Sequence, residues 1–389
     1  MVVVAEQHSA MKEGAGKKQK FLSGPLLICL DFLANKKCKI IFFTYLNSRR
    51  DEIKIAISQK GILTLAPNAI RGQQYWCPNC GQLVRICRGK AKKAYFAHQN
   101  DRQHGQGETN EHQVGKIQML KWAKRRGWQG ELEHYYPQIK QRADILLKRS
   151  TQQVIIEFQC SNLDLKRLVE RNQGYAQIGI KPIWILGSPY RHRLRANRQA
   201  QFTYLDHQKP TIYFWDYQKA ELIKMAGWIS AKAKINPQQV SQDVYRSQFS
   251  NGKNQTVRQI VTQVYQAGHE LSTSPLVAHC RETNWPFLAE PLFFWHLRQL
   301  LWIERFELGK TWLLREWLRG VDQFSAWLPL PCLTAQQRQQ VHQQLIWAWT
   351  KQLLTTRILK QDQHRIIYWH PPVWFPNYEA KLRALRRIK

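Results

Sequence analysis

The pattern of apolar and polar positions becomes regular near Ile53 and predicts a mixed α/β core. The segment "IKIAISQKGILTLAPNA", which begins there, predicts two short strands around a Lys-Gly turn. Thr109 to Gly127 has capping residues at its start, a glycine at its end and apolar residues at helical spacing, which together predict a helix. The next segments predict three strands, a helix and a buried strand: "ELEHYY", "RADILLKR", "VIIEFQCS", "LDLKRLVERNQGYAQIG" and "KPIWILG".

Changes in composition divide the chain into five parts. Residues 1–52 are an extension that we expect to be poorly ordered. Residues 53–105 hold a β-hairpin and a cysteine–histidine cluster, and residues 106–188 hold the mixed core. Residues 189–238 join a basic stretch, "RHRLRANR", to a predicted hairpin. Residues 239–389 predict a helical domain, in which Trp and Leu at spacings of three and four are more often core than a base-stacking surface.

The charge of the chain favours a polyanionic partner. Lys and Arg number 59 against 27 acidic residues, a formal charge of +32, and the excess is spread along the whole chain. Such a field attracts nucleic acid, and contacts to phosphates release counterions. Nucleic acid is therefore the expected partner, and a basic protein that is ribosome-associated or merely made soluble by its charge is the alternative. Charge does not distinguish an enzyme from a binding protein.

Cysteine placement and hydropathy favour a cytoplasmic protein without a membrane span. Cys77, Cys80 and Cys87 are clustered, and the eight cysteines lack the even, dense pattern of a secreted disulfide scaffold. Leu26 to Leu46 is apolar only in two interrupted pieces, each shorter than the ~20 residues that a membrane span requires. Asp31 lies inside this segment and argues against a signal peptide.

Two acids on neighbouring predicted strands are a candidate metal site. Asp144 and Glu157 share one face if their strands form a hairpin through "KRSTQQ", because paired strands lie about 4.8 Å apart. Hydrolysis of a phosphodiester needs a cation, and Mg²⁺ prefers oxygen ligands. Gln159 lies on the same face as Glu157, which is costly to bury without a partner or a metal. The alternative is a pair of salt bridges, Asp144 with Arg142 and Glu157 with an arginine of the following helix.

Helical spacing adds candidates and favours the metal interpretation. Glu108, His112 and Lys116 recur every four residues, so they can line one side of the preceding helix, and Glu108 or His112 would complete the site. Arg171 and Tyr175 have the same spacing on the following helix.

Seven segments, in this order, resemble the competence protein CoiA-like family: "YWCPNCGQLV", "YFAH", "ETNEHQVGK", "QRADILL", "IIEFQCS", "RNQGY" and "PIWIL". The resemblance extends over roughly Ile53 to Leu186. It implies a PD-(D/E)XK, restriction-endonuclease-like core with an N-terminal zinc-finger-like segment. It also implies a role in natural transformation and recombination of incoming DNA, with recombination proteins as further partners.

Carried over by residue, the resemblance makes Asp144 and Glu157 the ligands of Mg²⁺ or Mn²⁺. Gln159 occupies the position where the superfamily usually has lysine, and glutamine can orient a water but brings no charge. Lys116 would then supply the missing cation. The residues expected to contact DNA are Arg142, Arg171 and Tyr175 near the acids, and Arg191, Arg193 and Arg195 in the basic stretch.

The cysteine cluster predicts a structural zinc site. Cys77 and Cys80 form a CPxC knuckle, which in a cytoplasmic protein more often binds zinc than cycles redox. His98 is the third candidate ligand. The family resemblance suggests a second histidine three residues earlier, where this sequence has tyrosine, so the fourth ligand is His104 or Cys87. The alternative is that this chain has lost its zinc.

The predicted function is metal-dependent hydrolysis of DNA. The runner-up is a non-catalytic DNA-binding accessory protein of recombination that keeps a nuclease fold. A restriction-type endonuclease is a third hypothesis, for which the sequence contains no separate specificity domain that we can identify.

Overall fold

The computed structural model describes residues 55–387 except 60–62, 78–81, 90–93, 100–109, 233–234 and 251–254. Its contacts divide the chain into two compact units, Met1–Arg193 with Tyr213–Lys224, and Leu194–Ile212 with Met225–Lys389. Among the helices that the structure describes, we find none that is long and apolar enough to cross a lipid bilayer.

A small antiparallel sheet precedes the core. Its strand order is β2-β1-β3-β4-β5, and the strands are β1 (Ile55–Ser58), β2 (Leu63–Leu65), β3 (Tyr75–Trp76), β4 (Leu83–Cys87) and β5 (Tyr95–His98). Pairing of β1 with β2 confirms the two predicted strands, and their turn lies outside the described residues. Ala56, Tyr75, Val84 and Phe96 fill the core of this sheet, and the rings of Tyr75 and Phe96 lie 5.1 Å apart.

The mixed core follows the predicted order of elements. It contains α3 (Asn110–Lys124), β6 (Gln129–Tyr136), β7 (Gln141–Arg149), β8 (Gln152–Gln159), α4 (Leu165–Gln177) and β9 (Pro182–Leu186). Strands β6, β7 and β8 pair antiparallel, and β8 pairs parallel with β9. The predicted mixed α/β fold class is therefore confirmed.

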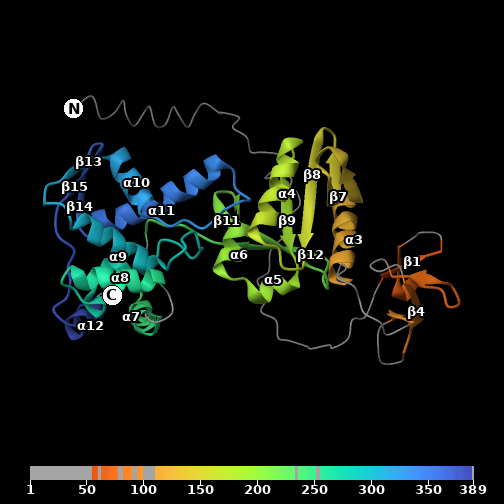
Figure 1. Cartoon of the computed structure of the whole chain (residues 1–389), viewed down its shortest axis with the longest axis horizontal. Helices are drawn as coiled ribbons and strands as arrows, with labels where there is room; N and C mark the ends of the chain where they lie inside the picture. The colour runs from red at the N-terminus through yellow and green to blue at the C-terminus, as the bar shows by residue number, and fades with distance from the viewer. Residues whose placement is uncertain are drawn as a thin grey trace. The chain divides into compact units, whose positions relative to one another are not determined.

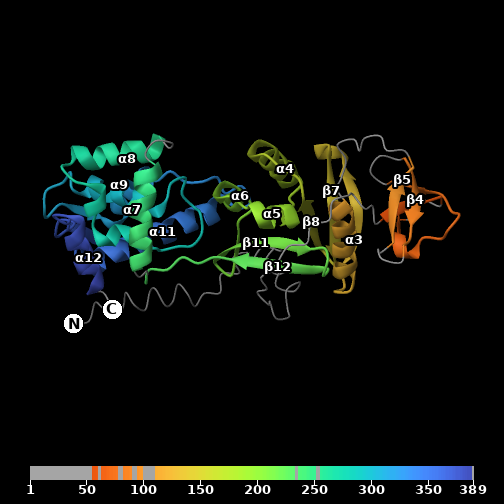
Figure 2. The same ribbon diagram turned by 90° about the horizontal axis from the view of Figure 1, so that it is seen from below.

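The sheet continues beyond β9. The basic stretch forms two short helices, α5 (Ser188–Arg193) and α6 (Ala196–Gln201), and the predicted hairpin is three strands, β10 (Tyr204–Asp206), β11 (Lys209–Asp216) and β12 (Glu221–Ala226). The full order is β10-β11-β9-β8-β7-β6, with β12 paired to β11 (Figure 2).

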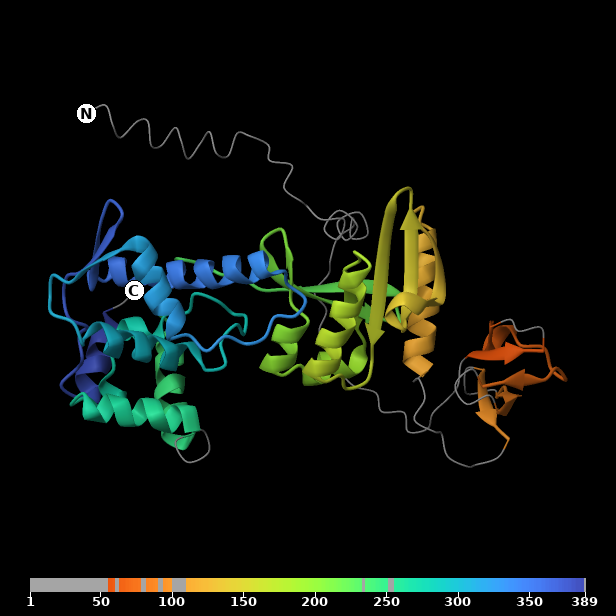
Figure 3. The ribbon, with the colours of Figure 1, turned by 45° about the horizontal axis from the view of Figure 1, so that its top comes forward.

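Helices α3 and α4 cover opposite faces of this sheet. On β8, Phe158 packs against Gly115 of α3, whereas Ile155 packs against Tyr175 of α4. Successive side chains of a strand point to opposite faces, so the two helices are separated by the strands, as Figures 1 and 3 show. Helix α4 starts where the Asp164 side chain accepts the Arg167 amide, 2.8 Å away, which satisfies an end group of the helix.

The second unit is mainly helical. Besides α6, its helices are α7 (Pro237–Ser250), α8 (Gln255–Gln266), α9 (Leu292–Ile303), α10 (Leu314–Gln323), α11 (Ala335–Thr355) and α12 (Tyr378–Arg386). It also contains a small sheet that the helical prediction did not include, with β13 (Thr311–Leu313), β14 (Leu359–Asp362) and β15 (Arg365–Tyr368). Trp295, Trp317 and Trp349 are completely buried, which confirms for these three that tryptophan forms core.

A buried polar network joins the last helix to this unit. The Lys381 ammonium donates to Ser274 Oγ and to His279 Nε2, both at 2.9 Å, and His279 Nδ1 lies 2.9 Å from Asp243. Burial lowers the pKa of Lys381 to about 7. Ser274, His279 and Lys381 are at most 1% exposed, so no substrate can reach this serine and histidine, and we assign the network a structural role.

Candidate active site

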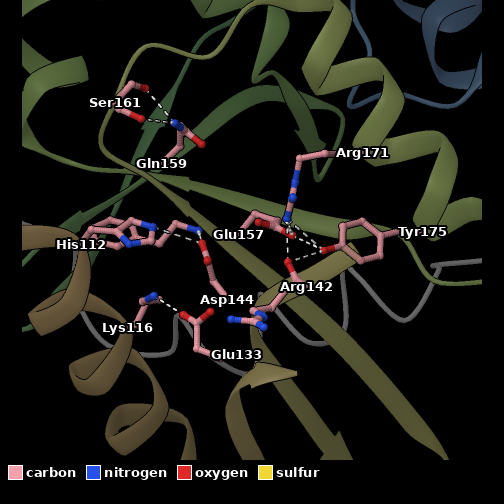
Figure 4. A network of polar contacts seen from close by, with 11 residues as sticks. His112, Lys116, Glu133, Arg142, Asp144, Glu157, Gln159, Ser161, Arg171 and Tyr175 are labelled. Carbon is pink, nitrogen blue, oxygen red and sulfur yellow. Dashed lines mark hydrogen bonds and ion pairs between the residues drawn. The ribbon is translucent and has the colours of Figure 1, made fainter. Parts of the chain in front are cut away.

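The two predicted acids lie where strands β7 and β8 separate. The β7–β8 ladder runs from Arg149–Gln152 to Ile145–Ile156, and the next residues on the two strands are Asp144 and Glu157. Beyond this point β8 stays paired with β9, because Glu157 and Trp184 are opposite each other in the register of the parallel strands. The strands therefore form a fork, and both acids lie at its base (Figure 4).

Glu157 is buried against helix α4. It is 3% exposed, and its Oε1 accepts hydrogen bonds from Arg171 Nη2 and from the Tyr175 hydroxyl. The same Arg171 nitrogen donates to the carbonyl oxygen of Arg142, 2.9 Å away. One half of the salt-bridge alternative, an arginine of the following helix paired with Glu157, is thus present in the structure.

The pKa of Glu157 reflects this burial. Desolvation, followed by repulsion from the Asp144 carboxylate, raises the pKa of Glu157 from 4.5 to about 7, although Arg171 and Tyr175 oppose the change. Burial and the neighbouring glutamate also raise the pKa of the Tyr175 phenol, so this hydroxyl keeps its proton and donates it.

Asp144 bridges β8 and helix α3. Its Oδ2 accepts the Phe158 amide at 2.8 Å, in the place where a β7 carbonyl would lie if the ladder continued. The same oxygen lies 3.3 Å from His112 Nε2, and the His112 ring stacks on Phe158 with 5.5 Å between centroids. Helix α3 therefore orients the Asp144 carboxylate through one of its three predicted residues.

The donor set fits a hard divalent cation. Within the described chain, the contacts of Glu157 all use Oε1 and those of Asp144 all use Oδ2, so each carboxylate keeps a second oxygen. A cation between the acids would also relieve the repulsion that raises the pKa of Glu157. No group of three or more His, Cys, Asp or Glu side chains in the described chain could hold a metal, so two carboxylates, a carbonyl and water would have to suffice.

Gln159 does not contact either acid. Its Nε2 donates to the Ser161 carbonyl at 2.8 Å and to the Ser161 hydroxyl at 3.0 Å (Figure 4). The amide is thus held at the end of β8.

Lys116 is paired with an acid that sequence reasoning missed. Its ammonium forms an ion pair with Glu133 of strand β6, and Lys116 is 4% exposed (Figure 4). The segment "ELEHYY" was predicted as a strand, and continuing its register with β7 would have placed Glu133 opposite Asp144. Its left-handed backbone, with φ of 59°, has no counterpart in the sequence pattern.

The acid of α3 whose contacts are described is Glu111. It accepts the Ser188 amide at 2.6 Å and the Ser188 hydroxyl at 2.5 Å, which ties α3 to the segment after β9. We assign it a structural role. Glu108, the predicted acid of this helix, lies outside the described residues.

The remaining arginines are found in different settings. Arg191 is exposed on α5 and lies 3.6 Å from Asp216, and Arg195 is exposed at the start of α6. The side chain of Arg193 lies outside what the structure describes.

Three of the five candidate zinc ligands are described, and Cys87 is the last residue of β4. Cys77 is buried after β3, and its amide donates to the Gln82 carbonyl at 2.7 Å, across the segment that holds the rest of the knuckle. His98 lies at the end of β5 and pairs with Val84. Cys80 and His104 lie outside the described residues.

The core is thus a mixed α/β domain in which two acids lie where two strands separate. The family model "Competence protein CoiA, nuclease-like domain" matches residues 108–263, and the model "Competence protein CoiA, N-terminal domain" matches residues 65–103. The chain belongs to the competence protein CoiA family.

A curated relative matches part of the chain. Competence protein CoiA of Bacillus subtilis (strain 168) is 29% identical over 121 residues, which cover 30% of this chain and 32% of that protein. The match thus spans about a third of the relative's length. No solved structure matches the chain.

Proposed function

We propose that this protein is a metal-dependent nuclease that hydrolyses DNA phosphodiesters during natural transformation and recombination. The observation that carries the proposal is the fork of β7 and β8, where Asp144 and Glu157 each keep a carboxylate oxygen for a cation. The name of the family and of its nuclease-like domain supports the same class of reaction.

Asp144 and Glu157 would hold Mg²⁺ or Mn²⁺, which supplies charge neutralisation at the phosphate and a nucleophilic hydroxide near neutral pH. Arg171 and Tyr175 fix one oxygen of Glu157, and the other oxygen would be the one that binds the cation. His112 fixes Asp144 in the same way. Because proton and cation compete for Glu157, whose pKa is raised to about 7, metal binding should strengthen as the pH rises through neutrality.

DNA is the proposed substrate because the chain carries a formal charge of +32. Single-stranded DNA and recombination proteins are the further proposed partners, and a cytoplasmic site of action fits the processing of incoming DNA. We also propose a structural zinc ion held by Cys77, Cys80, His98 and His104.

A second candidate is a DNA-binding accessory protein that does not cut. Two observations favour it: Glu157 is already paired with Arg171, and Gln159 brings no charge where the superfamily usually has lysine. Such a protein would keep the fold and the basic surface for recognition.

A nuclease assay with Asp144→Asn and Glu157→Gln tests the proposal. Each variant should abolish Mg²⁺- or Mn²⁺-dependent cleavage of single- and double-stranded DNA and leave DNA binding intact, since each removes a negative charge and adds no bulk. The matched control is Glu170→Gln on α4, an exposed acid that pairs with Arg167. Wild-type protein that binds DNA and never cuts it favours the accessory protein, and cleavage that persists in both variants places the catalytic site elsewhere.

A further inference from the structure

Strand β6 departs from regular geometry at one residue. Glu133 has a φ of 59°, in the left-handed region that a non-glycine residue seldom adopts. The β6–β7 ladder pairs Leu132 with Ile145 and His134 with Ala143, and between these pairs Glu133 stands opposite Asp144. The irregularity therefore lies beside the proposed metal-binding acid.

A residue keeps an energetically unfavourable backbone conformation when the surrounding structure enforces it, and such residues are common at functional sites. A glycine at this position would adopt the same φ at no steric cost. The chain has glutamate there, and the side chain of that glutamate is the ion-pair partner of Lys116.

The two side chains of the ion pair differ in their exposure to solvent. The Lys116 side chain is 5% exposed and the Glu133 side chain is 40% exposed. A buried ammonium loses its hydration and keeps its proton only if a counter-charge is near. Glu133 supplies that counter-charge and also limits where the ammonium can point.

We propose that Glu133 is a positioning residue, which holds Lys116 charged and directed toward the Asp144 side of the fork. Lys116 then provides the positive charge that Gln159 lacks, from the helix rather than from strand β8. This inference deepens the proposed function and rests on it. Glu133 acts through Lys116 and is not itself a metal ligand, in keeping with the lack of a third ligating side chain in the described chain.

Four variants separate a positioning role from an ordinary salt bridge. Glu133→Gln keeps the shape and removes the charge, Glu133→Gly also relieves the left-handed backbone, and Glu133→Asp keeps the charge. The matched control is Glu131→Gln, on the same strand, whose acid is exposed and contacts His134.

Glu133→Gln should lower kcat on DNA by ~10- to 100-fold, the scale for a residue that orients another residue of a metal site, with KM within about twofold of wild type. The alkaline limb of the pH profile should move to lower pH, because the variant removes a negative charge from beside the Lys116 ammonium. Glu133→Gly should lose activity to the same extent, and its melting temperature should be equal to or higher than that of Glu133→Gln, because both variants lose the charge and only glycine relieves the left-handed backbone. Glu133→Asp should recover part of kcat, and the Glu131 control should behave as wild type.

Unchanged kcat and pH profile in Glu133→Gln, together with a lower melting temperature, would overturn the proposal and leave the pair as a structural salt bridge. A wild-type protein that does not cleave DNA would refute the proposed function without testing the role of Glu133. NMR titration of ¹³C-labelled Lys116 in the full chain still reports on the pair in that case. A titration curve that Glu133→Gln does not move would refute the positioning role by itself.

Discussion

The buried Glu157 makes the stability of the metal-free protein depend on pH in an unusual direction. Its pKa is raised from 4.5 to about 7, so between these pH values the folded state binds a proton that the unfolded state has released. The contribution of Glu157 to the free energy of unfolding is fully present below about pH 4.5, and it is lost as the pH rises through 7. Most acids in folded proteins do the reverse, because their pKa is lowered.

The size of the effect follows from the same two values. A tenfold change in proton affinity corresponds to about 1.4 kcal/mol, so Glu157 should lower the free energy of unfolding by roughly 3 kcal/mol over this range. Glu157→Gln removes the titration and keeps the contacts of a neutral side chain with Arg171 and Tyr175. Any loss from the unpaired Arg171 is independent of pH, so it shifts the curve without changing its slope.

The assay is urea unfolding of wild type and Glu157→Gln from pH 4.5 to 8 in EDTA. Groups common to both proteins cancel in the difference between the two curves. That difference should change by roughly 3 kcal/mol in favour of the variant as the pH rises. Asp144→Asn should reduce the change, because repulsion from Asp144 is the second cause of the raised pKa.

A difference that stays constant with pH would refute this reasoning, because it would mean that Arg171 keeps Glu157 charged throughout. Addition of Mg²⁺ provides an independent check. If the cation binds the ionised pair, it should stabilise wild type more at pH 8 than at pH 6, and it should leave Glu157→Gln unchanged.

Two further predictions concern packing and zinc. Gly115→Ala should destabilise the protein by about 1–3 kcal/mol in urea unfolding, because the added carbon would lie 2.3 Å from a ring carbon of Phe158, whereas Gly89→Ala, with open space around it, should be neutral. A more stable Gly115→Ala would show that its helix propensity outweighs the clash. Purified protein should carry about one zinc ion that Cys77→Ser removes, and metal analysis that finds none in protein prepared without chelators would contradict the zinc site.

The elements of the core were predictable because their pattern is local. Helix α3 shows a helical period between a capping residue and a glycine, and β7 and β8 show apolar runs joined by a short polar turn. Once β7 and β8 are a hairpin, their register alone brings Asp144 next to Glu157. The candidate acids and the fold class therefore followed from the sequence and from the family that it resembles.

The partners of each acid depended on tertiary structure, since they come from distant parts of the chain. The sequence allowed Glu157 to bind either a metal or an arginine, and only the docking of α4 brings Arg171 and Tyr175 to one of its oxygens and leaves the other. Gln159 turns to Ser161 because β8 ends there.

Glu133 is the clearest case of a residue that the sequence did not single out. Its segment "ELEHYY" correctly predicts a strand, and no local pattern distinguishes this glutamate from its neighbour two residues earlier. Its pairing with Lys116 requires α3 to pack against β6, and its left-handed backbone is a property of the folded chain. Sequence period determines which residues share an element, whereas burial and the distance between charges decide what those residues do, and both are properties of the folded chain.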